Sequence, residues 1–128
     1  MTRPLLVDTD VMVDFLRGHP KAIALVNNNS PRIILSSITA AELFAGVKGE
    51  RELDTLDGLL SLFRIVPVSP QLARAGGLHK RDYGKSHGVG LADAMIAATV
   101  QAEGADFMTL NVKHYPMLKG LKPAYRKS

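Results

Sequence analysis

Among the residues whose side chains can bind metal ions, four lie directly beside an apolar run. Asp8, Glu42 and Asp93 are acidic residues at the end or start of such runs, and the polar residue Asn111 directly follows another. Carboxylates that converge repel one another, so a site built from them needs a cation. Carboxylate and amide oxygens are the ligands that Mg²⁺ prefers.

These side chains can meet if parallel strands end at the same edge of a sheet, because ligands bind outside the carboxyl ends of such strands. Apolar runs bounded by turn residues predict strands over residues 4–8, 32–36, 64–68 and 106–110. Helices are expected from about residue 10 to Gly18 and over residues 20–26, 40–47, 50–63, 70–83 and 91–103, with a last helical turn at 115–118. This alternation predicts an α/β fold, a doubly wound sandwich with a mainly parallel central sheet and helices on both faces.

The length of 128 residues and the hydrophobic fraction of 46% indicate a single domain over residues 1–128. We expect residues 122–128 to be a flexible tail. The glycine-rich, basic segment 79–90 is the other candidate for mobility. Cysteine is absent, which excludes a disulfide framework and thiolate metal sites.

The charge balance favours a polyanionic partner. The formal net charge is +4. If three of the 12 acidic residues bind metal, nine acidic residues remain to balance 16 Lys and Arg residues. The N-terminus lacks a signal-peptide core, and no segment offers the ~20 apolar residues of a membrane span. We therefore expect a cytoplasmic protein without membrane association.

Each acidic residue also has a purely structural interpretation. Thr39 and Glu42 have the spacing of a capping box, in which Glu42 reaches back to the Thr39 amide. Asp8 and Asp10 could accept amide hydrogen bonds at a helix start, and we favour this role for Asp10. Asn111 could be a turn residue.

Asp93 is harder to explain as a structural residue. Ile96, Ala97 and Val100 lie on the same helical face, so the Asp93 carboxylate shares an apolar face that should be buried. A helix N-terminus stabilises a negative charge by only ~0.3–1 kcal/mol, and burying an unpaired carboxylate costs far more. A cationic group is therefore expected beside Asp93.

Four segments in this order resemble PIN-domain ribonucleases, specifically the VapC-type toxins of toxin–antitoxin pairs: residues 7–10 (VDTD), 36–43 (SSITAAEL), 91–98 (LADAMIAA) and 109–115 (TLNVKHY). The resemblance implies that Asp8, Glu42 and Asp93 bind Mg²⁺ or Mn²⁺ and that Asn111 is the fourth catalytic residue. It also implies a homodimer, endonucleolytic cleavage of RNA (tRNA, rRNA or mRNA) and inhibition by a small antitoxin.

Basic and polar residues near these acids are candidates for binding the RNA substrate. Lys80, Arg81 and Lys85 lie shortly before the Asp93 helix, and Thr109 and Lys113 flank Asn111. Lysine and arginine bind the phosphate backbone without reading its sequence. We therefore predict that these five residues contact the substrate.

Two other functions compete with this interpretation. In a haloacid-dehalogenase-like phosphatase, Asp8 would be the nucleophile and Asp10 the acid and base, but a downstream pair of aspartates is missing. In a catalytically inactive PIN-like RNA-binding module, a core acid should be lost, and all three are present. The apolar stripe of Leu53, Leu56, Leu60 and Phe63 fits either a partner surface or the core.

Overall fold

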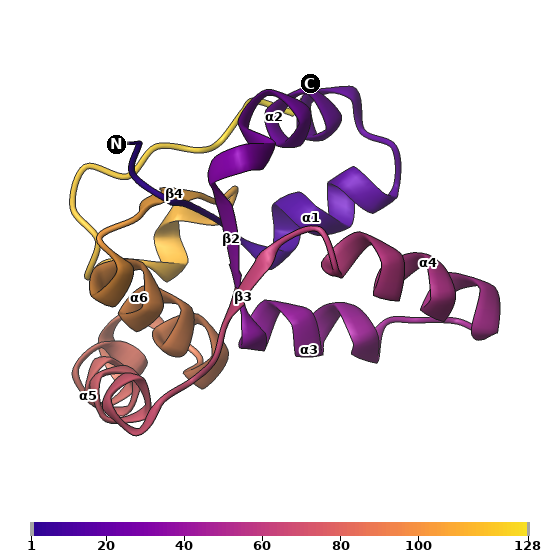
Figure 1. Cartoon of the computed structure of the whole chain (residues 1–128). Coiled ribbons are helices and arrows are strands. Elements are labelled where there is room, and N and C mark those ends of the chain that lie inside the picture. Colours follow the sequence, from indigo (N-terminus) through magenta and orange to yellow (C-terminus); the bar gives the residue numbers. More distant parts are fainter. Residues whose placement is uncertain (1, 128) are drawn as a thin grey trace.

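In the computed structural model, which describes residues 2–127, a four-stranded parallel sheet lies between two layers of helices (Figure 1). The strands are β1 (Leu5–Val7), β2 (Ile33–Ser36), β3 (Arg64–Val66) and β4 (Asp106–Met108), in the spatial order β3-β2-β1-β4. The helices are α1 (Thr9–Leu16), α2 (Pro20–Asn29), α3 (Ser37–Ala45), α4 (Glu50–Leu60), α5 (Pro70–His87) and α6 (Leu91–Glu103). The predicted α/β fold and parallel sheet are confirmed.

The two faces of the sheet bury separate cores because side chains alternate along each strand. On β1, Leu5 and Val7 point to a core shared with α1, α2 and α4, whereas Leu6 points to a core shared with α5 and α6. All three side chains are fully buried. Burial on both faces explains why the strands are continuous apolar runs.

Strand order reverses between β1 and β4. The chain runs from β1 outward to β2 and β3, and then returns to place β4 on the opposite side of β1. The carboxyl ends of β1 and β4 therefore form the point at which an open α/β sheet binds its ligands. Asp8 directly follows β1 at this point.

The segment predicted to be mobile is helical instead. Residues 79–87 complete α5, and only Gly88, Val89 and Gly90 connect it to α6. The glycines inside α5 are tolerated because the helix packs closely on α6, and this packing outweighs their low helix propensity. The helix ends at Gly88, whose φ of 65° is the left-handed conformation that glycine adopts without strain.

The C-terminal residues are not a free tail as far as residue 127, and Ser128 lies outside the described residues. We call residues 121–127 the strap. The Ala124 amide donates to the Thr109 carbonyl at 2.8 Å, and the Tyr125 hydroxyl donates to Asp14 at 2.6 Å. Lys127 Nζ donates to the same carboxylate at 2.9 Å. The strap therefore lies against α1 and the loop after β4, and its flexibility stays a prediction.

Two helical predictions also need correction. The last helical turn is a 3₁₀ turn at Val112–His114, before the predicted residues 115–118, so Tyr115 directly follows it. On α4, Leu56 and Leu60 belong to the core, but Leu53 remains 39% exposed. The apolar stripe is thus partly core and partly surface.

Candidate active site

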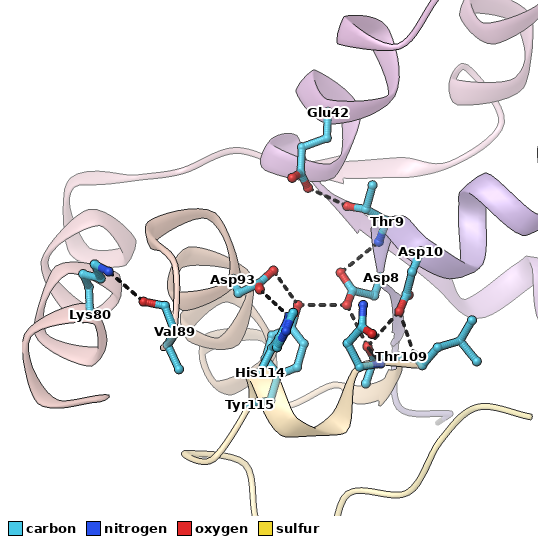
Figure 2. Close-up of polar contacts among 12 residues, drawn as sticks. Asp8, Thr9, Asp10, Glu42, Lys80, Val89, Asp93, Thr109, His114 and Tyr115 are labelled. Atoms are coloured by element: carbon cyan, nitrogen blue, oxygen red, sulfur yellow. Dashed lines mark hydrogen bonds and ion pairs between the residues drawn. The ribbon is translucent and has the colours of Figure 1, made fainter. Parts of the chain in front are cut away.

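Asp8 is the centre of a hydrogen-bond network at the carboxyl ends of β1 and β4 (Figure 2). Its Oδ1 accepts from the Thr9 amide at 2.8 Å, so Asp8 is the N-cap of α1. Its Oδ2 accepts from the Thr109 hydroxyl at 2.8 Å and lies 2.8 Å from the Tyr115 hydroxyl. The residue is only 4% exposed. A small number of fixed donors therefore determine its orientation.

Burial, together with the nearby charge of Asp10, raises the pKa of Asp8 from 3.8 to about 6. Hydrogen bonds from Thr109, Tyr115 and the Thr9 amide oppose this rise but do not cancel it. Burial also raises the pKa of Asp10. The pocket thus holds negative charge at a cost that a bound cation would relieve.

Asp93 approaches Asp8 from the first turn of α6. Its Oδ1 lies 3.1 Å from the Tyr115 hydroxyl, and its Oδ2 lies 3.1 Å from His114 Nδ1. The Asp93 side chain is 28% exposed, while Ile96 and Ala97 on the same helical face are fully buried. The structure places an imidazole and a phenol beside Asp93, both supplied by the chain after β4, and the expected cationic partner stays a prediction.

Glu42 lies on α3 and connects to Asp8 through Thr9. Glu42 Oε1 accepts from the Thr9 hydroxyl at 2.7 Å, and that hydroxyl lies 3.0 Å from the Thr39 hydroxyl. The capping-box interpretation of Glu42 is wrong, because Ser36 is the N-cap of α3 and its hydroxyl accepts from the Ile38 amide. Thr39 is fully buried inside the helix.

The remaining residues of the β4 end have different roles. Asp10 Oδ2 accepts from the Leu110 amide at 2.9 Å, so Asp10 ties α1 to this loop, consistent with a structural role. Thr109 is fully buried and its hydroxyl donates to Asp8, so it orients that carboxylate, and contact with substrate stays a prediction. Asn111 and Lys113 are exposed at the rim.

The three residues of α5 that were predicted to bind RNA, Lys80, Arg81 and Lys85, are helical and exposed. Lys80 Nζ donates to the Val89 carbonyl at 2.8 Å, which fixes the α5–α6 connection, and Figure 2 shows it apart from the carboxylates. Arg81 pairs with Asp82 at 2.9 Å. Lys85 lies in the last turn of α5, close in sequence to the start of α6. RNA contact by these residues stays a prediction.

The chemistry of the donors fits a hard divalent cation, since the site offers carboxylate oxygens. Within residues 2–127, however, no three acidic or histidine side chains are arranged as a ready metal site. The Tyr115 hydroxyl links Asp8 to Asp93, and Thr9 links Asp8 to Glu42, with its amide on Asp8 and its hydroxyl on Glu42. Metal binding would thus draw on side chains whose oxygens now accept hydrogen bonds.

Thr9, His114 and Tyr115 were not assigned a role from the sequence. Thr9 lies between two aspartates, and the other two end the motif at residues 109–115, so their positions were visible. Their function was not, because a single tyrosine in such a segment carries no sign of its hydroxyl's partners. Its hydroxyl partners depend on which strand lies beside β1.

Comparisons with known proteins agree with this arrangement. The model of the PIN domain family matches residues 5–115. Ribonuclease VapC19 of Mycobacterium tuberculosis is 41% identical over 124 residues, covering 94% of this chain and 98% of the relative. Ribonuclease VapC10 of the same organism is 35% identical over 125 residues, covering 94% and 92%.

A solved structure described as a toxin-antitoxin complex from Klebsiella pneumoniae contains a chain of the same fold. It superposes with a TM-score of 0.83 at 25% identity, covering 96% of this chain and 99% of the other. The phosphatase alternative finds no support, since the two aspartates it requires serve as an N-cap and a tie to the β4 loop. The chain belongs to the PIN-domain family and, within it, to the VapC group.

Proposed function

We propose that this protein is a metal-dependent endoribonuclease that hydrolyses RNA phosphodiester bonds and acts as the toxin of a toxin–antitoxin pair. One observation carries the proposal: Asp8, Glu42 and Asp93, from three separate elements, are linked by hydrogen bonds at the point where strand order reverses. The names of the VapC19 and VapC10 relatives support RNA as the substrate.

Asp8, Asp93 and Glu42 would hold Mg²⁺ or Mn²⁺, with Asn111 as a further oxygen donor at the rim. A bound divalent cation supplies positive charge to phosphate oxygens and lowers the pKa of a bound water. Asp8 is buried and anchored by three donors, so its role is to fix the position of the site. Glu42 is exposed and Asp93 is partly exposed, so these two can face a substrate.

The other residues of the site bind and orient the substrate. His114 is half-exposed, and Asp93 holds its Nδ1, which leaves Nε2 free to meet an RNA phosphate. Lys113 lies on the same turn. Arg81 and Lys85 extend the positive charge along α5. These contacts are to the RNA backbone, so they determine how tightly RNA binds. Which RNA binds then depends on the shape of the protein surface.

We infer that a cognate antitoxin binds the groove between α1, α3 and α4. This groove has a volume of about 570 Å³ and is lined by apolar residues such as Leu16 and Leu43, together with Arg51 and Glu42. An apolar segment in the groove would place its next residues beside Glu42. An antitoxin arginine there could pair with the carboxylates and block metal or RNA. The toxin-antitoxin complex of similar fold supports such a partner.

The test uses purified wild-type protein with labelled total RNA. We expect cleavage with Mg²⁺ or Mn²⁺, loss of cleavage in EDTA, and loss in each of Asp8→Asn, Glu42→Gln and Asp93→Asn. Equal cleavage in EDTA would reject metal dependence. Sequencing the 5′ ends of the fragments would identify the RNA. Gel filtration tests the expected homodimer, and co-expression with the adjacent small reading frame should give an inhibited complex.

A further inference from the structure

Tyr115 connects two of the three acidic residues through a single atom. Its hydroxyl oxygen lies 2.8 Å from Asp8 Oδ2 and 3.1 Å from Asp93 Oδ1. Asp8 follows β1, Asp93 lies on α6, and Tyr115 follows the 3₁₀ turn after β4 (Figure 2). Within residues 2–127, no other side chain lies within hydrogen-bond distance of both carboxylates, and the single hydroxyl hydrogen donates to one of them at a time.

The position of this hydroxyl is set by the packing of the ring. Tyr115 is 1% exposed, and its ring packs edge-on against Phe107 of β4 with 4.8 Å between ring centroids. Its amide donates to the Val112 carbonyl, and its carbonyl accepts from the Leu118 amide. The ring therefore cannot follow a movement of either carboxylate, and the carboxylates must conform to it.

We infer that Tyr115 is a positioning residue for metal binding: its hydroxyl fixes the carboxylate of Asp93 relative to that of Asp8. The inference rests on the proposed function, because the two carboxylates are the proposed ligands. The orientation of the Asp93 carboxylate depends on Tyr115 more than that of Asp8 does. Asp8 has two other donors, Thr9 and Thr109, whereas the second partner of Asp93 is the half-exposed His114.

The variant Tyr115→Phe tests this because it removes one oxygen and keeps the ring that packs on Phe107. We expect Mn²⁺ affinity, measured from the electron paramagnetic resonance signal of free Mn²⁺, to fall about 10- to 100-fold, as for other groups that orient metal ligands. The melting temperature in EDTA reports any separate effect on folding. Tyr83→Phe, in a half-buried tyrosine of α5, is the matched control and should bind Mn²⁺ like the wild type.

A spectroscopic measurement follows Tyr115 directly. The chain has three tyrosines and no tryptophan, so its near-ultraviolet difference spectrum on adding Mg²⁺ is dominated by tyrosine. We expect saturating Mg²⁺ to give a tyrosine difference signal in the wild type and in Tyr83→Phe, and its loss in Tyr115→Phe. If Tyr115→Phe cannot be purified, the double variant Tyr83→Phe, Tyr125→Phe, which keeps Tyr115 alone of the three tyrosines, should retain the signal, and its loss would overturn the role.

The possible outcomes separate this inference from the proposed function. Wild-type Mn²⁺ affinity in Tyr115→Phe, an equal loss in Tyr83→Phe, or no Mg²⁺-induced tyrosine signal in the wild type would each overturn the positioning role while leaving the nuclease standing. Absence of Mn²⁺ binding by the wild type would overturn both. A selective loss of affinity with an unchanged melting temperature in EDTA would establish the role.

Discussion

At the scale of single residues, protonation of Asp8 links the stability of the metal-free protein to pH. The folded-state pKa of Asp8 is about 6, above the ordinary value of 3.8, because burial and Asp10 disfavour its charge. The stability that comes from protonated Asp8 is therefore fully present below pH ~4 and is lost as pH rises through about 6. The contribution of Asp8 to the stability of the metal-free protein should therefore be larger at pH 4 than at pH 8.

The variant Asp8→Asn removes this charge. One pKa unit corresponds to about 1.4 kcal/mol, so we expect a gain of roughly 1–3 kcal/mol in unfolding free energy at pH 8 in EDTA. The lower end allows for the amide group, which cannot accept all the bonds that the carboxylate does. The gain should vanish near pH 4. Urea unfolding at both pH values measures it, and Asp54→Asn on exposed α4 is the control, with no gain expected at either pH.

Glu42 offers the clearest separation of chemistry from stability. Glu42→Gln keeps an oxygen that can accept from Thr9, so the melting temperature should stay near that of the wild type. RNA cleavage should fall by about 100-fold or more, as when one group that stabilises transition-state charge is lost. Glu50→Gln, on the exposed start of α4, should cleave normally. Full activity of Glu42→Gln would remove it from the proposed site.

At the scale of elements, the close approach of α5 and α6 depends on one glycine. A Cβ atom at Gly76 would lie 2.4 Å from Met95 Sδ and 3.1 Å from Met95 Cα, and the second distance involves backbone that cannot move freely. The neighbouring Gly77 has no atom within 4 Å of such a Cβ. The two positions form a matched pair on one helix.

Gly76→Ala should therefore destabilise the protein by ~1–3 kcal/mol through overpacking. Gly77→Ala should stabilise it by ~0.4–1 kcal/mol, because alanine restricts the unfolded chain and favours helix. Thermal or urea unfolding measures both. If both variants were stabilised, the helices would have to lie further apart than this packing indicates.

The elements were largely predictable from the sequence, and their exceptions have physical causes. The four strands were found because burial on both faces of the sheet makes them continuous apolar runs. The extent of α5 was missed because Gly84 and Gly88 look alike in sequence, yet only Gly88 has a positive φ. Likewise Asp8 could be placed at a strand end, but Tyr115 could not be assigned to it without knowing that β4 lies beside β1.

At the scale of the whole molecule, the strap joins the C-terminus to the first helix through Asp14. Burial alone would raise the pKa of Asp14, but hydrogen bonds from Lys127 and Tyr125 and the charge of Lys127 outweigh it, so the pKa lies below its ordinary value. The stability this contributes is present at neutral pH and is lost as pH falls through the lowered pKa. The strap should thus loosen in acid.

Hydrogen exchange of the Ala124 amide, which donates to the Thr109 carbonyl, is the measurement. We expect Asp14→Asn at pH 7 to speed this exchange relative to wild type, while an exposed-site control, Asp57→Asn, leaves it unchanged. Exchange that is equally slow in Asp14→Asn would show that the strap is held by its other contacts, such as the stacking of Tyr125 on His19.

No helix within residues 2–127 is long and apolar enough to cross a membrane.

The reversal of strand order also governs when the site comes into existence during synthesis. Asp8 leaves the ribosome well before its partners Thr109 and Tyr115, which follow 101 and 107 residues later. Until both have emerged, the Asp8 carboxylate lacks two of its three donors, and β4 has not covered the edge of β1. A chain that has not yet emerged as far as residue 115 therefore lacks the hydrogen-bond network around Asp8, so the site forms late in synthesis.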